Sequence, residues 1–300
     1  MELWMIMAMT GAVAQAVRTA GQKWLTAEAG PIGASFSRFI FATPFSWLWL
    51  WIWQLHTSQP LPPIAPTFWF WVIFGGSLQI IFTVALVQLL RLRNFAAGVA
   101  FSKTEVLQAA IFEAILVGYI ASFHVGLAII IGIIAVLLLS SKKGDMGFFG
   151  ILRSVGTGAG LLGLVSGACL GAATVSYGIA SDYLASEDPI LRASVTAAIT
   201  CTIQTIIMGA LMMKWTPTQL RASIVQWRPG VVIGIFSSLS TITWFVAFAI
   251  YYVGPARAIG QIELVASILL SALLFKEKIS RTEYIAIALL SLSVLIILLT

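Results

Sequence analysis

Residues 230–252 read GVVIGIFSSLSTITWFVAFAIYY, a run of 23 positions without one charged side chain. A helix needs about 20 mainly apolar residues to cross the hydrocarbon core of a bilayer. Mainly apolar runs of similar length recur along the chain at 2–24, 32–54, 67–90, 96–117, 123–140, 157–181, 190–213, 230–252, 255–275 and 282–299. The pattern predicts an all-α integral membrane protein with ten transmembrane helices.

The composition of the chain indicates that the bilayer is its main solvent. Of its 300 residues, 60% are hydrophobic and 9% are charged, whereas a soluble domain carries about 25% charged residues. The net charge of +6 suits contact with anionic lipid headgroups. The basic residues are scattered over short loops, so nucleic acid is not an expected partner. Cys169 and Cys201 lie in apolar stretches, which indicates neither a disulfide framework nor a metal site, and no cofactor is expected.

An internal repeat divides the ten runs into two halves. When the chain is slid along itself by 158 positions, Glu105 falls on Glu263. The same offset without gaps places Pro31-Ile32 on Pro189-Ile190 and Ser122 on Ser280. A unit of five spans that is repeated in tandem must insert its second copy upside down, and inverted repeats of this kind hold their substrate site at the repeat interface near the midplane.

The expected architecture is therefore two five-helix inverted-topology repeats around a central cavity. The first repeat is expected at 1–141, the connecting loop at 142–156 and the second repeat at 157–300. No linker is long enough for a soluble domain, and the two covalently joined halves need no partner to complete the pseudo-symmetry. We therefore expect a monomer.

Ionisable side chains inside a bilayer are costly, so each is a candidate for function. Glu105 and Glu263 each lie about ten residues into a predicted span, near mid-depth. Both either serve transport, as ligands for an amino group or as carriers of a coupling proton, or belong to a buried structural ion pair. Arg18 and Arg257 are the candidate partners. Lys103 is two residues from Glu105, so it points to a different helix face and pairs elsewhere or snorkels.

Polar residues recur at helical spacing on one face of several runs, and the offset of 158 relates these faces between the halves. The runs 2–24, 67–90, 96–117, 157–181, 230–252 and 255–275 are expected to line the cavity. The candidate substrate-binding or cavity-lining residues are Gln15, Arg18, Gln79, Thr83, Ser102, Glu105, Ser166, Ser176, Ser237, Thr241, Trp244, Phe248, Glu263 and Ser267. The alternative for each polar member is a hydrogen bond between helices without a role in transport.

The loops differ strongly in basic residues. Odd-numbered loops hold twelve, whereas even-numbered loops hold only Arg192 and Arg257 near their edges. The twelve are Lys23, Arg91, Arg93, Lys142, Lys143, Arg153, Lys214, Arg221, Arg228, Lys276, Lys278 and Arg281. By the positive-inside rule the odd loops are cytoplasmic, which places both termini outside.

Several short motifs near the end of the chain are similar to those of the EamA family in the drug/metabolite transporter superfamily. The stretch Tyr252–Leu299 carries them: Gly254-Pro255-Ala256, Glu263-Leu264 and the turn Phe275-Lys276-Glu277-Lys278-Ile279-Ser280. Arg38 lies where the family often has an arginine, and the ten-span pattern resembles the family over the whole length.

Two features depart from that family. The first half has Gly118-Tyr119 where the turn glutamate would lie. Family members also usually keep both termini in the cytoplasm, against the charge count, so the orientation stays open.

The resemblance implies a bacterial inner-membrane exporter that works by alternating access. Amino-acid export is the expected function, by fold-level analogy with bacterial amino-acid exporters of YddG type. The alternatives are a drug or nucleotide-sugar type transporter of the same superfamily, a channel or scramblase, and an intramembrane enzyme. No DDxxD-like, HExxH-like or CxxC cluster supports an enzyme. The expected partners are a small-molecule substrate and the lipid bilayer.

Overall fold

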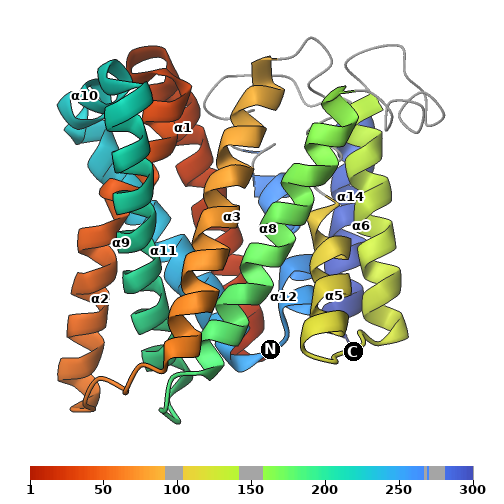
Figure 1. Ribbon diagram of the computed structural model, residues 1–300. Coiled ribbons are helices and arrows are strands. Elements are labelled where there is room, and N and C mark those ends of the chain that lie inside the picture. Colours follow the sequence, from red (N-terminus) through yellow and green to blue (C-terminus); the bar gives the residue numbers. More distant parts are fainter. Residues whose placement is uncertain (92–103, 142–157, 267–268, 270–280, 300) are drawn as a thin grey trace.

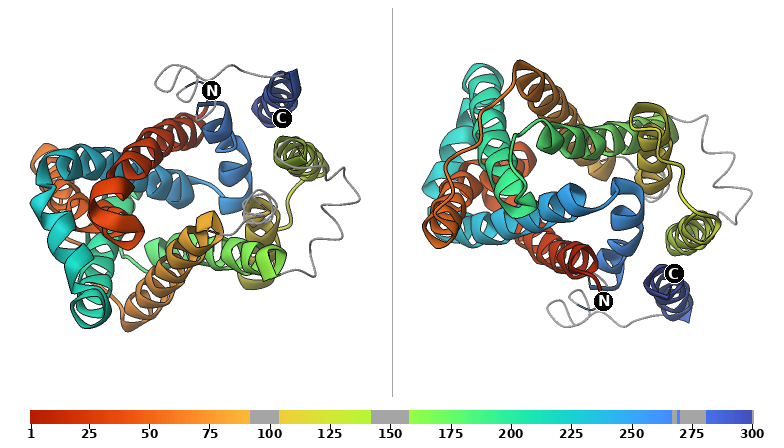
Figure 2. Two further views of the ribbon diagram at one scale, coloured as in Figure 1. Left: turned by 90° about the horizontal axis from the view of Figure 1, so that it is seen from above. Right: turned by 90° about the horizontal axis from the view of Figure 1, so that it is seen from below.

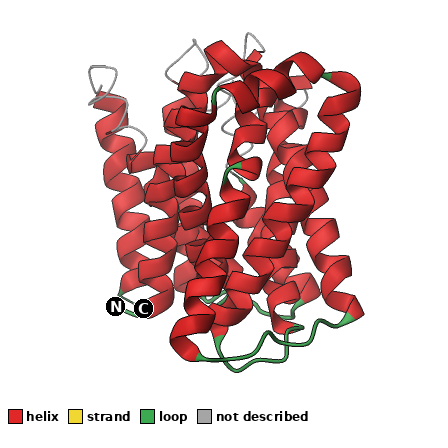
Figure 3. Ribbon diagram, turned by 90° about the vertical axis from the view of Figure 1, so that its left-hand side faces the viewer, coloured by secondary structure: helices red, strands yellow, loops and turns green. Residues whose placement is uncertain are grey.

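The structure, a computed structural model, describes residues 1–91, 104–141, 158–266, 269 and 281–299. These residues form helices joined by short loops, with no strand among them beyond an isolated bridge between Ile64 and Leu184. Figure 1 shows an upright bundle, and Figure 3 shows from the side that the loops gather at its two ends. The all-helical class expected from the sequence is confirmed for this part of the chain.

The described helices other than α10 overlap the predicted apolar runs, and α1 extends over parts of two of them. The first half contains α1 (Leu3–Ile40), α2 (Ala42–Thr57), α3 (Pro66–Arg91), α5 (Glu105–Leu116) and α6 (Phe123–Ser141). The second half contains α8 (Gly158–Asp182), α9 (Pro189–Trp215), α10 (Pro217–Val225), α11 (Trp227–Ile250), α12 (Val253–Ile259) and α14 (Arg281–Leu298). The short α10 was not expected from the sequence.

A kink at Gly30 divides α1 into the first two predicted spans. Gly30 has φ 69° and ψ 167°, a conformation that side chains other than glycine rarely adopt. Pro31 then opens the second segment, as proline often does at the first helical position. The side-chain oxygen of Gln219 on α10 accepts the backbone N–H groups of Ile32 at 3.1 Å and Gly33 at 3.3 Å. The kink is therefore held from the second half of the chain.

The repeat landmark of the second half also opens a helix. Pro189 is the first residue of α9, and Asp188 caps it by accepting the backbone N–H groups of Ile190 at 2.8 Å and Leu191 at 3.2 Å. Pro31 and Pro189 therefore each begin a helical segment, as the sequence predicted, and the equivalence of the two helices stays a prediction.

The protein is a membrane protein. Within the described ranges, the helices long and apolar enough to cross a bilayer are Pro66–Leu86, Gly160–Asp182, Pro189–Trp215 and Trp227–Ile250, with shorter apolar helices at Phe123–Ala135 and Tyr284–Leu298. Large apolar side chains also cover the outside of the bundle: Ile115, Phe123 and Ile206 are 72%, 80% and 63% exposed. Water-soluble monomers rarely expose apolar patches of such extent. The number of ten spans stays a prediction.

Helices from the two halves interleave. α1 packs along α11, α3 along α8, α2 against α9 and α6 against α14. Figure 2, which views the bundle from both ends, shows the α6 and α14 pair at one edge. Both termini lie at the same end of the bundle (Figure 1), here called the terminal face. The segment of α1 before Gly30, α3 and α6 run away from the terminal face, whereas α8, α11 and α14 run towards it.

Candidate functional site

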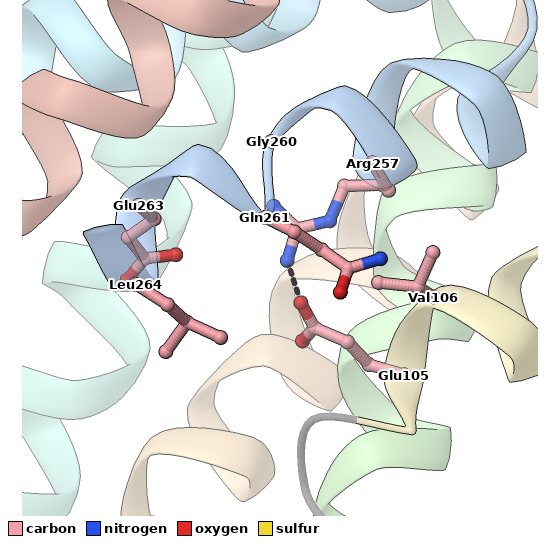
Figure 4. Close-up of a pocket in the computed structure, with 7 residues that line it drawn as sticks. All are labelled: Glu105, Val106, Arg257, Gly260, Gln261, Glu263 and Leu264. Atoms are coloured by element: carbon pink, nitrogen blue, oxygen red, sulfur yellow. Dashed lines mark hydrogen bonds and ion pairs between the residues drawn. The ribbon is translucent and has the colours of Figure 1, made fainter. Parts of the chain in front are cut away.

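A buried ion pair joins the two halves of the chain. Arg257 on α12 donates from Nη2 to Oε1 of Glu105, the first residue of α5, and the two side chains are 6% and 5% exposed. Figure 4 shows this pair together with Gln261, and with Glu263 to one side. Arg257 was one of two candidate partners named from the sequence, and the structure assigns it to Glu105.

Glu263 is held from α1. The side-chain amide of Gln15 donates to Oε2 of Glu263 at 2.7 Å. The helical path breaks between Arg257 and Glu263, because α12 ends at Ile259 and a turn precedes the helical residues 262–266. A Cβ at Gly260 would overlap the ring of Trp244, so glycine in this turn lets α11 approach closely. The break in the helix therefore lets the side chains of Arg257 and Glu263 face the same part of the bundle interior.

Two more buried guanidinium groups lie on α1. Arg18 is 6% exposed and Arg38 is 8% exposed, both inside the bundle. Arg18 lies three residues after Gln15, the residue that donates to Glu263, on the same helix.

An aromatic layer covers the ion pair. The guanidinium carbon of Arg257 lies 4.6 Å from the ring centre of Trp244, which suits a cation–π interaction. Trp244 stacks on Phe248 with ring centres 5.5 Å apart. α1 packs closely against the other side of this layer at Gly11. A Cβ at this position would lie 3.1 Å from Trp244 and 2.9 Å from Thr243.

Two cavities lie on either side of this layer. The inner one, at the ion pair, has a volume of about 10 Å³ and is lined by Glu105, Val106, Arg257, Gly260, Gln261, Glu263 and Leu264. This is about the size of one water molecule, so no solute fits there in this conformation. The outer cavity, here called the vestibule, has a volume of about 470 Å³.

The vestibule lies at the terminal face. It is lined by the ends of α5, α8 and α11 and the start of α12: Glu113, Leu116, Val117, Val175, Gly178, Ile179, Asp182, Tyr183, Phe248, Ala249, Ile250, Tyr251, Tyr252 and Val253. Phe248 lines the vestibule and stacks on Trp244, which in turn lies over Arg257. Two aromatic rings therefore separate the vestibule from the central charges.

Glu113 fixes the start of α12. Its carboxylate accepts the backbone N–H groups of Val253 at 2.6 Å and Gly254 at 2.8 Å, and the residue is 3% exposed. Two carboxylates of α5 therefore bind α12. Glu105 binds the side chain of Arg257, and Glu113 binds the backbone N–H groups at the start of the helix.

A second buried polar cluster joins α3, α8 and α9. Tyr177 donates from its hydroxyl to Oε1 of Gln79 at 3.0 Å. The amide of Gln204 donates to the same oxygen and to the Tyr177 hydroxyl, the latter at 3.1 Å. The described hydrogen bonds within this cluster connect three helices, which is the structural role that buried polar groups often have in membranes.

Comparison with known proteins identifies the second half of the chain. The profile of the EamA-like transporter family matches residues 158–299. Residues 158–299 form an EamA-like transporter domain. This family belongs to the drug/metabolite transporter superfamily of membrane transporters, which agrees with the expectation that the chain is not an enzyme. The domain supplies Arg257, Glu263 and the aromatic layer.

Solved structures show the same fold over the whole chain. Seventeen solved chains match significantly. One of them, a crystal structure of a protein, covers 99% of this chain and 98% of its own length with a TM-score of 0.73 and 16% identity. At this identity the likeness shows the fold alone. No curated protein matches the sequence significantly.

The structure brings several of the nominated residues together around the EamA-like domain's charged turn. These are Gln15, Glu105, Trp244, Phe248, Arg257 and Glu263. Arg18 is buried on α1, three residues after Gln15. Gln79 belongs instead to the cluster with Tyr177 and Gln204. Ser102, Lys103 and Ser267 lie outside the described residues.

Other nominated hydroxyl groups bond to their own helices. Thr83 donates to the carbonyl of Gln79, Ser176 to Ala172 and Ser237 to Ile233, each four residues back. Thr241 is half-buried on α11, and Ser166 is buried with no partner for its hydroxyl among the described residues.

Sequence reasoning missed Gln261, Glu113, Tyr177 and Gln204. Gln261 lies after the break in the helix, where regular spacing gives the wrong face. Glu113 is eight residues after Glu105 and therefore on the same helix face, a signal that could have found it. Gln204 lies in a span that was not assigned to the cavity, and only the fold shows that it reaches Tyr177.

Proposed function

We propose that the chain is a secondary transporter that works by alternating access and exports small metabolites, amino acids in particular, across the inner membrane of a bacterium. The observation that carries the proposal is the buried ion pair of Glu105 and Arg257 beside Glu263. Ionisable groups that are buried inside a membrane-spanning bundle mark solute and ion pathways in membrane proteins. The EamA-like domain contributes Arg257 and Glu263, and the first half contributes Glu105.

Helix packing supports two inverted five-helix repeats. When each helix is exchanged for its counterpart 158 positions away, the contact of α1 with α11 becomes that of α8 with α3, and both contacts occur. The contacts of α2 with α9 and of α6 with α14 map onto themselves. Exchanged helices run in opposite directions (Figure 1). Repeats of this kind allow one half to rock against the other around a fixed site.

The two cavities support a conformation in which the central site is closed and the vestibule already forms the outer part of the solute path. A solute would enter or leave through the vestibule, and the aromatic layer of Trp244 and Phe248 would have to part before it reached Glu105 and Arg257. Alternating access requires such a barrier on each side of the site. We assign the aromatic layer to the side of the terminal face.

Charge distribution supports an outward orientation of the terminal face. The described basic residues of the helix ends and loops at the opposite face are Lys23, Arg91, Lys214, Arg221, Arg228 and Arg281. At the terminal face, Arg192 is neutralised by Asp182 at 2.8 Å. The positive-inside rule then places the terminal face outside the cytoplasm. For an exporter, the vestibule would be the exit.

The proposal is tested by counterflow in proteoliposomes. Vesicles are loaded with a mixture of unlabelled amino acids, and the uptake of each labelled amino acid is followed. Accumulation that depends on the internal load is the expected result. The double variant Glu105→Gln/Glu263→Gln is expected to abolish net export while the protein still inserts. Its matched control is Glu28→Gln/Glu187→Gln, because these two glutamates are exposed at opposite ends of the bundle.

Three results would change the proposal. Normal transport by the Glu105→Gln/Glu263→Gln variant would remove the glutamates from the mechanism. Absence of counterflow for every amino acid in folded protein would favour a drug or nucleotide-sugar substrate of the same superfamily. Flux that neither saturates nor responds to the internal load would indicate a channel or scramblase.

A further inference from the structure

Acidic and aromatic side chains line the vestibule. Among the described residues of its wall, the charged ones are Glu113 and Asp182, and none is a lysine, an arginine or a histidine. Its volume of about 470 Å³ lies within the range of pockets that hold small ligands. The vestibule is therefore large enough for a small solute, and its charged side chains favour a cation.

The helix ends around the vestibule favour the same charge. Three of the described helices end there, with Leu116 the last residue of α5, Asp182 of α8 and Ile250 of α11. The free carbonyl groups at the C-terminus of a helix carry partial negative charge, which stabilises a nearby cation. α12 begins at the same place, but the carboxylate of Glu113 accepts two N–H groups at its start. The backbone therefore adds to the negative potential of the side chains.

Asp182 is the carboxylate of this wall that a solute can reach. Its side chain is 67% exposed, and its Oδ1 accepts Nη1 of Arg192 at 2.8 Å. Arg192 also donates from Nη2 to the carbonyl of Ala249 at 3.0 Å, so it joins α8 to α11. Oδ2 of Asp182 accepts no hydrogen bond from the described residues. The carboxylate therefore has an oxygen left for a second cation.

Two tyrosines that follow α11 give the vestibule an aromatic wall. Tyr251 and Tyr252 line it, are 37% and 39% exposed, and meet edge to face with ring centres 5.4 Å apart. Tyr251 stacks on Trp4 of α1 with ring centres 4.4 Å apart. Tyr252 stacks on Tyr119, which follows α5. Rings held in this way can attract an ammonium group through their faces and pack against an apolar group.

We propose that the vestibule binds the solute as an organic ammonium ion with an apolar group, the ammonium lying near Asp182 and the apolar group against the tyrosines. This inference rests on the transport function proposed above and narrows its solutes to those that carry an amino group. The cation site lies outside the aromatic layer of Trp244 and Phe248. It is therefore separate from the ion pair of Glu105 and Arg257.

The first test compares four probes of simple structure. Phenethylamine is a cation with a phenyl group, 3-phenylpropionate an anion with the same group, and 2-phenylethanol its neutral counterpart, whereas methylamine is a cation without the ring. Binding of each to the purified protein in detergent is measured by calorimetry at neutral pH. We expect phenethylamine to bind most tightly. Binding of phenethylamine no tighter than that of 2-phenylethanol overturns the proposal.

The second test changes the wall of the vestibule. Asp182→Asn is expected to weaken phenethylamine binding about 2-fold to 5-fold, the range for a solvent-exposed ion pair. Tyr252→Leu is expected to weaken it by a similar factor, the range for an exposed cation–π contact. The controls are Glu187→Gln, an exposed carboxylate of the same face outside the lining, and Tyr284→Leu on α14, which is 60% exposed. Equal effects of the variants and their controls overturn the proposal.

Arg192→Gln separates a binding role of Asp182 from a purely structural one. Glutamine keeps a donor for Asp182 and the carbonyl of Ala249 but removes the charge that competes with the solute. We expect Arg192→Gln to strengthen phenethylamine binding about 2-fold to 5-fold, opposite in sign to Asp182→Asn. If both variants weaken binding, the pair only holds the wall in shape and the proposal is overturned. Loss of binding in Glu263→Gln with unchanged binding in Asp182→Asn would place the cation at the central site and would also overturn it.

Counterflow separates failure of this inference from failure of the transport function. Phenethylamine binding that depends on Asp182, without counterflow of any solute, supports the cation site and contradicts the transport proposal. Counterflow that 2-phenylethanol and 3-phenylpropionate inhibit as strongly as phenethylamine contradicts the cation site and leaves transport in place.

Discussion

The ion pair of Glu105 and Arg257 gives a prediction about stability that does not depend on the substrate. Glu105→Gln leaves Arg257 buried without its carboxylate, and Arg257→Gln leaves Glu105 without its cation. With side chains only 5% and 6% exposed, water cannot replace the missing partner. Removing one member of a buried pair costs about 3–5 kcal/mol.

The double variant Glu105→Gln/Arg257→Gln should lose less than the sum of the single variants. Two neutral amides can bond to each other, and neither leaves a charge in the bilayer. Replacing both partners of a buried pair by neutral groups is often nearly neutral. We therefore expect the double variant to lie close to the wild type, with a coupling energy of about 6–10 kcal/mol, the sum of the two single losses.

Thermal unfolding in one detergent, followed for all four proteins, measures this cycle. At about 2–4 °C per kcal/mol, each single variant should melt roughly 6–20 °C below the wild type. The double variant should recover most of that difference. Losses that simply add in the double variant would refute the buried pair, because independent sites show additive effects.

Three further predictions use the same melting assay. Glu113→Ala should lower the free energy of unfolding by about 2–5 kcal/mol, because the two backbone N–H groups at the start of α12 lose their acceptor. Glu113→Gln should lower it less. An unchanged melting temperature in the alanine variant would contradict the role of Glu113 as a cap. Gly30→Ala should lower the free energy of unfolding by about 1–3 kcal/mol, because the φ of Gly30 is 69°. The control is Gly126→Ala, whose new Cβ meets open space and should leave stability unchanged. Equal effects of the two variants would mean that the kink does not require glycine. Tyr177→Phe should cost about 1–2 kcal/mol by removing the donor to Gln79, and no loss would show that the cluster does not contribute to stability.

Much of the fold could be predicted because the bilayer imposes a simple rule on sequence. The uncharged run 230–252 corresponds to α11 at Trp227–Ile250, and Pro31 and Pro189 begin helices as the repeat indicated. Both predictions depend on local chemistry, namely span length and the conformational limits of proline and glycine.

The site was less predictable because its contacts join residues far apart in sequence. Glu105 and Arg257 are 152 positions apart, so the sequence could nominate both but not pair them. The turn after Ile259 changes the face that Gln261 and Glu263 present, which regular helical spacing does not anticipate. Thr83, by contrast, has the spacing of a cavity residue and bonds to its own helix. The roles of all these residues in transport stay predictions.

The links from α5 to α12 also constrain how the chain enters the membrane. Glu105 and Glu113 are synthesised with the first half, but the residues that neutralise or cap them, Arg257 and Val253, follow 152 and 140 positions later. At about 5–20 residues per second, translation of that interval takes on the order of 10–30 s. During this time α5 holds two carboxylates without the partners that they have in the folded chain. We therefore expect the first half of the chain to be less stable before the EamA-like domain follows than in the full-length protein.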